Sequence, residues 1–272
     1  MWQDSPAVAG AARFHVKHEW LYGRQAVREA LRANRRHFFR LLIAVENRPK
    51  PVLEEIRELA SRASLPVEAC RRSDLGWLQG IDQGLALECS PYPYVDLSEI
   101  LSSAPESGEP ACLLVLDQLQ DPQNLGTLLR TADAVGVCGV LIPPRRAAGI
   151  TPAVSNASAG ASEHLQVAQA NLAQSIPRLK EQGLWVVGLE SGAGGQGIEE
   201  VDLSTPIALV VGNEAGGLRS LVQKECDRRI RIPMRGHVDS LNAGVAGSLA
   251  LYAVWHARRM RLERDRQAGA GA

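Results

Sequence analysis

Between residues 112 and 260, short continuous apolar runs alternate with segments of helical periodicity. The apolar runs have strand length and predict strands at Cys112–Leu116, Val137–Ile142, Leu184–Leu189, Ile207–Val211 and Arg229–Ile232. Helical patterns lie between them at Leu125–Val135, Leu172–Glu181 and Leu218–Glu225, and a long helix is predicted at Ala243–Met260. Such alternation predicts an α/β fold with a mostly parallel sheet that is covered on both faces.

The first hundred residues show the same kinds of pattern on a smaller scale. Short strands are predicted at Leu41–Val45 and Leu85–Cys89, and an amphipathic helix at Val52–Arg62. We therefore predict a small α/β domain over residues 18–95, a linker rich in turn formers over 96–110, and a larger domain over 111–262. Residues 1–17 are expected to be flexible, and the tail 263–272 to be disordered.

Composition narrows the class of protein. The chain has 272 residues, 45% hydrophobic content and 22% charged content, which are ordinary values for a globular protein. No apolar run reaches transmembrane length, and no secretory signal begins the chain, so a cytoplasmic location is expected. The five cysteines are scattered and form no C-x-x-C pair, which favours reduced, partly buried thiols and no metal site.

A net charge of zero conceals a basic N-terminal region. Arg24, Arg28 and Arg32 repeat every four residues, so a helix would carry them in one stripe. A solvated helix face explains such a stripe, and so does a surface that contacts the phosphates of a nucleic acid. The uneven distribution of charge favours RNA contacts at these three arginines.

Three segments share one layout, in which an apolar strand runs into a polar loop and then a helix. They read L-D-Q-L-Q-D-P-Q-N-L-G-T-L-L-R from Leu116, V-V-G-N-E-A-G-G-L from Val210, and I-P-M-R-G-H-V-D-S-L-N from Ile232. Parallel α/β sheets place their ligands at such junctions, so the three loops predict a single site.

The loops also limit the ligand. A G-x-G-x-x-G fingerprint and a G-x-x-x-x-G-K-[ST] loop are both missing, which disfavours a dinucleotide or a nucleoside triphosphate. Glycines, amides and hydroxyls with few lysines suit a ligand that is read by backbone groups and apolar walls, such as an adenosine with a small charged tail.

In these three motifs the sequence resembles the SpoU (TrmH-type) family of RNA ribose 2′-O-methyltransferases. The N-terminal stretch H-E-W-L-Y-G-R-Q-A-V-R-E-A-L is similar to the start of the RNA-binding domain in the RlmB-type enzymes, which methylate a guanosine of 23S ribosomal RNA. The resemblance covers about residues 18–260. It implies a C-terminal trefoil-knot (SPOUT) methyltransferase domain, a small N-terminal α/β RNA-binding domain, and a homodimer whose sites borrow residues from the partner.

The resemblance also implies that S-adenosylmethionine is the cofactor. Gly212, Ile232 and Leu241 match positions that contact the cofactor, and Met234 and Leu189 complete the candidate set. Ribosomal RNA is the implied partner, with no membrane and no metal involved.

Five residues form the candidate catalytic set. Family mechanisms often assign proton removal to the residue that matches Arg130. A guanidinium ordinarily has a pKa above 12 and is a poor proton acceptor. We therefore expect Arg130 to anchor the phosphate beside the target ribose and to stabilise the developing alkoxide, and to act as the base only if strongly perturbed. Asn124, Glu214, Ser240 and Asn242 would hold Arg130, the ribose and the loops, and Glu214 could receive a proton through water.

Other functions remain open on the sequence alone. A transfer RNA enzyme, an antibiotic-resistance enzyme acting on ribosomal RNA, and a catalytically silent RNA-binding protein would share much of this pattern. An N-terminal domain favours ribosomal RNA, since the simplest transfer RNA enzymes of the family lack one. The joint presence of the candidate catalytic residues argues against a silent homologue, and the missing phosphate fingerprint argues against an oxidoreductase.

Overall fold

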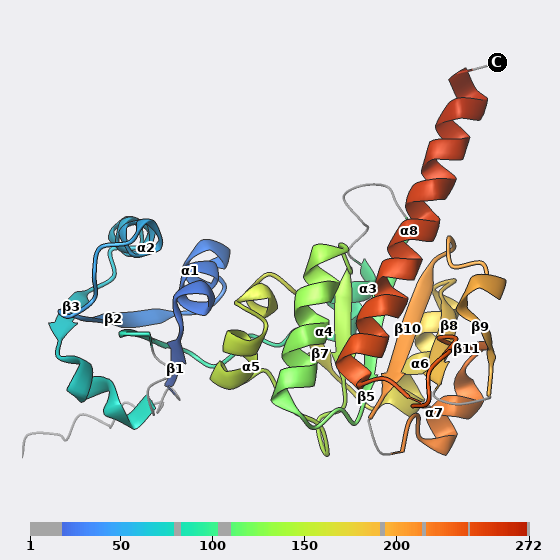
Figure 1. The fold of residues 1–272 in the computed structure, drawn as a ribbon, viewed down its shortest axis with the longest axis horizontal. Coiled ribbons are helices and arrows are strands. Elements are labelled where there is room, and N and C mark those ends of the chain that lie inside the picture. The colour runs from blue at the N-terminus through green and yellow to red at the C-terminus, as the bar shows by residue number, and fades with distance from the viewer. Residues whose placement is uncertain are drawn as a thin grey trace, which may run out of the picture.

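A computed structural model describes residues 18–78, 83–102, 110–190, 194–213, 216–238 and 240–270 of the chain. These residues form two α/β units that lie side by side (Figure 1). The smaller unit contains β1 (Glu19–Tyr22), α1 (Arg24–Ala33), β2 (Phe38–Ala44), α2 (Pro51–Arg62), β3 (Val67–Cys70), the 3-10 helix η1 (Arg72–Leu78) and β4 (Leu85–Cys89).

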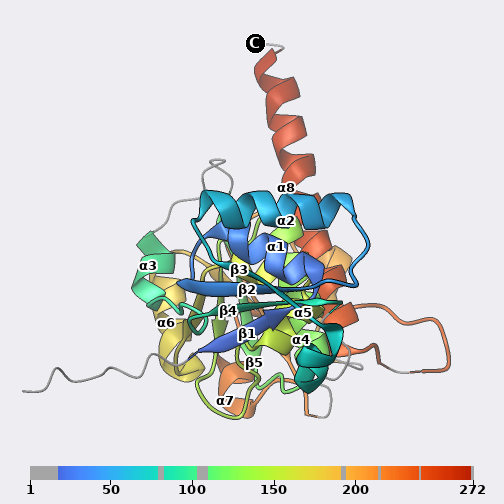
Figure 2. The same cartoon turned by 90° about the vertical axis from the view of Figure 1, so that its left-hand side faces the viewer.

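The small unit is built on a four-stranded sheet in the order β1-β4-β2-β3. β4 pairs antiparallel with β1 and β2, and β3 pairs parallel with β2. Helices α1 and α2 cover one face of this sheet (Figure 2) and bury Val27, Leu31 and Ile56 against Leu41 and Leu87. This apolar core gives the unit its own hydrophobic interior.

The larger unit contains a seven-stranded parallel sheet in the order β7-β6-β5-β10-β8-β11-β9. Its strands are β5 (Cys112–Asp117), β6 (Gly139–Ile142), β7 (Val167–Gln169), β8 (Trp185–Glu190), β9 (Gln196–Gly197), β10 (Ile207–Gly212) and β11 (Arg228–Arg231). Its helices are α3 (Leu97–Ser102), α4 (Pro122–Ala134), α5 (Pro152–Ala157), α6 (Leu172–Glu181), α7 (Ser220–Glu225) and α8 (Ala243–Ala270), with short 3-10 turns η2 (Ala161–Glu163) and η3 (Ile198–Glu200).

Both faces of this sheet are buried, as the sequence predicts. Alternate side chains of β5 and β10 enter two separate cores, because successive side chains of a strand point to opposite faces. On β10, Leu209 packs under α4 and α8, whereas Val210 packs toward α3, α6 and α7. The predicted mostly parallel α/β sheet is therefore confirmed.

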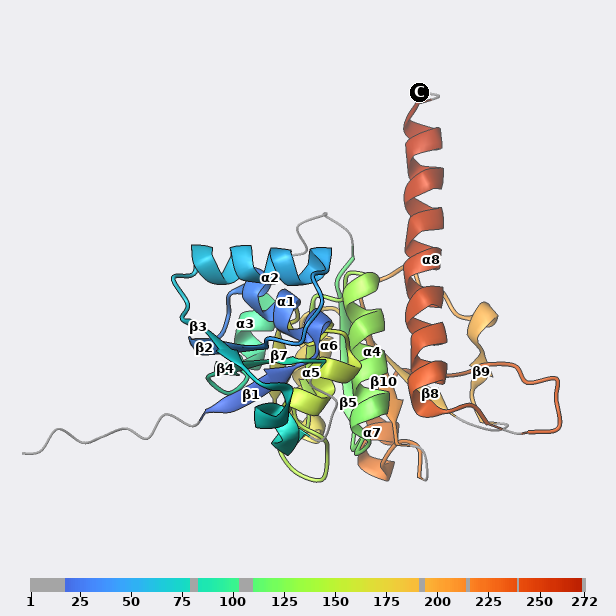
Figure 3. The same cartoon turned by 60° about the vertical axis from the view of Figure 1, so that its left-hand side comes forward.

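Two predictions of irregular structure are wrong. Part of the predicted linker is helix α3, whose Leu97 and Ile100 are buried against the large sheet, and residues 103–109 lie outside the described residues. The predicted disordered tail instead continues α8 to Ala270 (Figure 3). Its arginine and alanine residues favour helix, and Arg259 pairs with Glu263 one turn on. None of the described helices is long and apolar enough to cross a membrane.

The described cysteines are free thiols. Burial raises the pKa of the Cys89 and Cys226 thiols to about 12 and that of Cys112 to about 11. These three groups are therefore protonated at neutral pH and are poor nucleophiles.

A buried ion pair joins the two units. Arg36, which precedes β2, donates to Glu163 of η2 through Nε at 2.7 Å and Nη2 at 2.9 Å, and both side chains are almost fully buried. Ser155 donates to the same carboxylate at 2.9 Å, and Arg36 also donates to Glu19 at 3.0 Å. Burial alone would lower the pKa of the Arg36 guanidinium, but the hydrogen bond and charge of Glu163 outweigh burial and raise it.

Neighbouring contacts reinforce the junction. The Tyr92 hydroxyl donates to the Leu165 carbonyl oxygen at 2.6 Å, and Arg35 donates to the same oxygen. Burial raises the pKa of Tyr92 to about 12, so the hydroxyl keeps its proton. Because the charges of Arg36 and Glu163 are both buried, loss of either side chain would leave the other unpaired and would disturb the relative placement of the two units.

We predict that Glu163→Gln lowers the free energy of unfolding by about 3–5 kcal/mol, because Arg36 would remain buried without the carboxylate of its buried partner Glu163. Chemical denaturation measures the effect. The control is Glu68→Gln, whose partner Arg40 is 42% exposed and whose loss should cost less than about 1 kcal/mol. Equal effects of the two substitutions would contradict the structural role of the buried pair.

Candidate functional site

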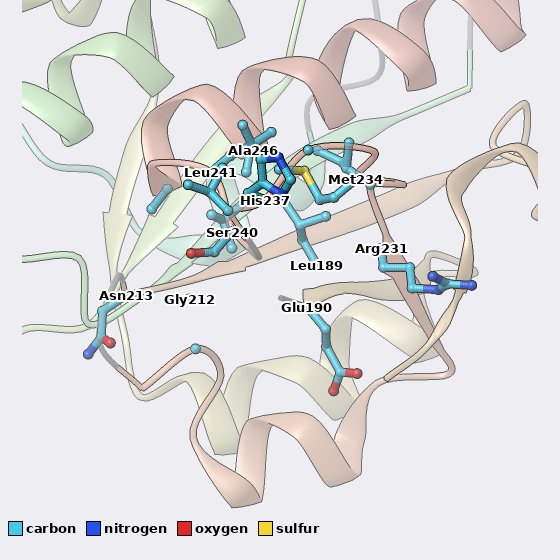
Figure 4. A pocket seen from close by; sticks show the side chains of 16 residues that line it. Leu189, Glu190, Gly212, Asn213, Arg231, Met234, His237, Ser240, Leu241 and Ala246 are labelled. Atoms are coloured by element: carbon cyan, nitrogen blue, oxygen red, sulfur yellow. The ribbon is translucent and has the colours of Figure 1, made fainter. Parts of the chain in front are cut away.

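A cavity of about 380 Å³ opens at the carboxyl ends of β8, β10 and β11. The loop between β11 and α8 forms one of its walls (Figure 4). All five candidate cofactor residues line this cavity, and so does the candidate catalytic Ser240: Leu189, Gly212, Ile232, Met234, Ser240 and Leu241. We call this cavity the donor pocket.

Strand register brings these residues together. Val211 of β10 lies level with Leu189 of β8, and Leu189 lies level with Ile230 of β11. Because the strands are parallel, the loops that follow all leave from one edge of the sheet. Residues more than forty positions apart in the chain thus line a common cavity.

Gly212 is required by the turn that follows it. A side chain at this position would place its Cβ 2.2 Å from the carbonyl carbon of Gly217 and 2.6 Å from the Leu218 nitrogen. Asn213 and Gly217 exchange backbone hydrogen bonds of 3.2 and 3.1 Å, and the Asn213 side chain accepts from the Gly216 nitrogen at 2.7 Å. The turn therefore closes directly onto the end of β10.

The candidate catalytic residue Glu214 lies outside the described residues. Its neighbours Asn213 and Gly217 both line the donor pocket. Its role therefore stays a prediction from the sequence.

Asn124 and Asn242 meet at the start of two helices. The Asn242 side-chain nitrogen donates to Asn124 Oδ1 at 2.8 Å, and Asn242 Oδ1 accepts from the Val245 nitrogen at 3.2 Å. Asn242 thus caps α8 while it contacts α4. Asn124 does not cap α4, since Asp121 accepts from the Gln123 nitrogen at 3.0 Å and fills that position. Asn124 is instead buried in the first turn of α4.

Arg130 lies apart from the other candidate catalytic residues. It is exposed on α4, two turns beyond Asn124, and has no hydrogen-bond or ion-pair partner within the described part of the chain. It does not line the donor pocket of its own chain. The next residue, Thr131, contacts Ser248 of α8 at 2.8 Å, so Arg130 lies beside the helix pair α4–α8.

The three arginines predicted to bind RNA are on α1, as expected, but carboxylates surround two of them. Arg28 pairs with Glu29 at 2.8 Å, and Arg32 pairs with Glu29 and Glu55. Arg24 donates to Asn47 and to the Gln83 carbonyl oxygen. Much of the positive charge of the stripe is therefore paired with acidic side chains of the protein itself.

Sequence reasoning missed two charged residues of the donor pocket, Glu190 and Arg231. They end β8 and β11 and are paired in register. Glu190 also accepts hydrogen bonds from Gln223 and Arg229. Their position directly after an apolar strand run was the available signal. His237, in the third motif, lines the pocket as well (Figure 4).

The donor pocket combines apolar walls, backbone groups and a few charged side chains. Leu189, Val211, Ile232 and Leu241 supply apolar surface, and its polar side chains include Glu190, Asn213, Arg231, His237 and Ser240. A cavity of this size and composition suits a small organic ligand with polar ends.

Models of two known protein families together match most of the described chain. The model of the SpoU rRNA methylase family matches residues 111–252, and that of the RNA 2′-O ribose methyltransferase substrate-binding domain matches residues 20–95. A Bacillus subtilis protein, YacO, which is named for the TrmH family of tRNA/rRNA methyltransferases, is 40% identical over 244 residues; the match covers 89% of this chain and 97% of YacO.

Solved structures show a similar fold. An AdoMet-bound rRNA methyltransferase from Sinorhizobium meliloti superimposes with a TM-score of 0.72 at 25% identity, covering 89% of this chain and 87% of that one. The SpoU methyltransferase AviRb from Streptomyces viridochromogenes gives a TM-score of 0.74 at 22% identity, covering 89% and 90% of the two chains. The latter likeness concerns the fold alone.

We predict that Asn242→Asp and Asn242→Ala separate the two roles of Asn242. The aspartate keeps the helix cap but cannot donate to Asn124, and should lower the free energy of unfolding by about 1–3 kcal/mol. The alanine loses both interactions and should cost about 1 kcal/mol more. Asn171→Ala, which removes only the cap of α6, is the control at about 1 kcal/mol. If Asn242→Asp is as stable as the unsubstituted protein, the bond to Asn124 contributes nothing.

Proposed function

The chain belongs to the SpoU rRNA methylase family, and on that premise we propose that it methylates a ribose 2′-hydroxyl of RNA, with a guanosine of 23S ribosomal RNA as the target. It is an S-adenosylmethionine-dependent RNA methyltransferase of the TrmH/SpoU type. One observation carries the proposal furthest: three separate segments of the chain line the donor pocket.

The residues of the donor pocket fit S-adenosylmethionine. Leu189, Ile232 and Leu241 offer apolar and backbone surface for an adenosine, while Glu190 and Arg231 offer opposite charges for an amino-acid tail. The cofactor supplies a methyl group on an electrophilic sulfonium, so the protein needs only to align the groups and to help remove one proton.

Asn124 and Asn242 hold the α4 and α8 termini beside this pocket through their mutual hydrogen bond. Ser240 lies in the pocket wall, where its hydroxyl can bind the ribose. Arg130 is assigned to the phosphate of the target nucleotide and to the charge that develops on the 2′-oxygen. Glu214 keeps its predicted role as a holding group or a proton acceptor through water.

The position of Arg130 supports a homodimer. Beside it, α8 exposes an apolar row in which Val245 is 46%, Leu249 49% and Tyr252 50% exposed. Monomeric proteins rarely expose such a contiguous row, and a second copy of the same surface would cover it. In that dimer Arg130 reaches the donor pocket of the partner instead of its own. The homodimer and the trefoil knot both belong to this proposal.

The N-terminal unit favours ribosomal RNA over transfer RNA as substrate. Residues 20–95 match a substrate-binding domain of RNA ribose methyltransferases, and the simplest transfer RNA enzymes of the family have no such domain. A cytoplasmic location fits a substrate of this kind.

We predict that the purified protein transfers a methyl group to a ribose of 23S ribosomal RNA, as mapped by mass spectrometry. Arg130→Ala should lower kcat about 100- to 1,000-fold, because stabilisation of the developing charge is lost. Arg178→Ala, on the exposed end of α6, is the control and should be fully active. A methyl group found on a base instead of a ribose would contradict the proposed reaction. Full activity of Arg130→Ala would contradict the role proposed for Arg130.

A mixed dimer tests whether Arg130 acts across the interface. Coexpressed Arg130→Ala and Gly212→Ala chains form a heterodimer in which one donor pocket is intact and faces an intact partner arginine. We expect the isolated heterodimer to regain up to about half of the activity of the unsubstituted dimer, since one of two sites is complete. Lack of recovery would place Arg130 in its own site.

We predict that Gly212→Ala abolishes the binding of S-adenosylhomocysteine in calorimetry, because the new Cβ meets backbone atoms of the turn. Gly216→Ala is the matched control. Its Cβ would meet only the Asn213 side chain at 3.5 Å, an ordinary contact, so binding should stay within about twofold. Equal binding by the two variants would contradict the role given to the turn.

A further inference from the structure

A second cavity lies on the same edge of the large sheet as the donor pocket. It has a volume of about 300 Å³ and is found at the carboxyl ends of β5, β6 and β7. Its polar lining consists of Gln118, Arg145, Arg146, Asn171 and Arg219. We call it the arginine pocket; none of its residues belongs to the candidate site described above.

Positive charge dominates the arginine pocket. Arg145 and Arg146 are exposed and have no ion-pair or hydrogen-bond partner among the residues that the structure describes. Asn171 caps α6 by accepting from the Ala173 nitrogen at 3.1 Å, so the positive end of that helix dipole also faces this edge.

Arg219 is held in place by a buried acid. Its Nε donates to Asp117 Oδ1 at 2.6 Å, and its backbone nitrogen donates to Oδ2 at 2.8 Å. The Asp117 side chain is fully buried, whereas that of Arg219 is 43% exposed. No described acceptor engages the terminal nitrogens of Arg219, which leaves them for an external anion.

Backbone strain is concentrated around this cavity. Gln118 and Arg146 adopt left-handed φ values of +61° and +58°, which cost energy for residues with a side chain. Such strain often persists where a ligand site requires a particular loop shape.

The arginine pocket lies between the N-terminal unit and the donor pocket. On one side, Gly217, which lines the donor pocket, is only two residues before Arg219. On the other side, the loop after β6 ends at Ile150, whose nitrogen donates to the Tyr94 hydroxyl at 2.7 Å, at the end of the N-terminal segment. An RNA that spans the two units and inserts a nucleotide into the donor pocket would pass the carboxyl ends of β5 and β6, where this cavity lies.

We propose that the arginine pocket binds a phosphodiester group of the RNA strand that carries the target ribose. This inference rests on the proposed function and adds to it a site that fixes the strand beside the reacting nucleotide. Guanidinium groups match the geometry of phosphate oxygens, and a fixed phosphate would set the register of the strand without reading its bases.

The test is the affinity of the full-length protein for unmethylated 23S ribosomal RNA transcript, measured by filter binding at several salt concentrations. The variant is Arg145→Ala/Arg146→Ala. Its control, Arg178→Ala/Arg266→Ala, removes two exposed arginines from the last turn of α6 and the end of α8. The control therefore changes the net charge equally.

We expect the Arg145→Ala/Arg146→Ala variant to bind the transcript at least tenfold more weakly than the control at 0.15 M salt. The slope of log affinity against log salt should fall by about one, as for one lost phosphate contact. S-adenosylhomocysteine affinity should stay within twofold. If the double variant does not fold, Arg145→Gln replaces it, with the same expected direction.

Two results would overturn the proposal: RNA affinity and salt slope equal to those of the control, or pyrophosphate binding that depends on the two arginines while RNA binding does not. The second result would assign the pocket to a small free phosphate compound. Because the assay measures binding, its failure is distinguishable from failure of the proposed function, which would appear as RNA binding without methyl transfer.

Discussion

The parallel register of β8, β10 and β11 is the constraint on which the site depends. Leu189, Val211 and Ile230 lie at neighbouring positions of adjacent strands, so the polar segments that follow them emerge together. A shift of one residue in any of these strands would reverse which side chains face each core. The two apolar cores therefore fix the register, and the register in turn forms the donor pocket. The chemistry of the loops depends on the packing of residues that never contact the ligand.

Much of this arrangement could be predicted from the sequence, because continuous apolar runs and helical periodicity report burial directly. The strands around Leu114 and Leu209 and the helix α6 were placed correctly for that reason. The convergence of the second and third motifs also follows from a general property of parallel sheets. The arginine pocket uses the same edge, with the side chains of Arg145, Arg146 and Arg219 where the donor pocket has apolar walls.

The features that were missed depend on partners distant in sequence or on weak local signals. Glu163 has no pattern that identifies Arg36 as its partner, since the two lie 127 residues apart. Asp117 and Arg219 meet only because β5 and β10 are neighbours. Helix α3 is too short for periodicity to reveal, and the extension of α8 is supported by propensity and local ion pairs instead of burial. The role of Arg130 rests on a proposed contact with a second chain, so its placement in a site stays a prediction.

Hydrogen–deuterium exchange with and without S-adenosylhomocysteine tests the central claim most directly, because it reports on all the segments of the donor pocket in one experiment. Bound ligand should slow amide exchange together in the three segments that line the cavity, namely at Leu189 and Glu190, at Val211, Gly212, Asn213 and Gly217, and at Arg231, Ile232, Ser240 and Leu241. The outer face of α2 should exchange at an unchanged rate. Slowing confined to one of these segments, or its absence from all of them at saturating ligand, would contradict the account.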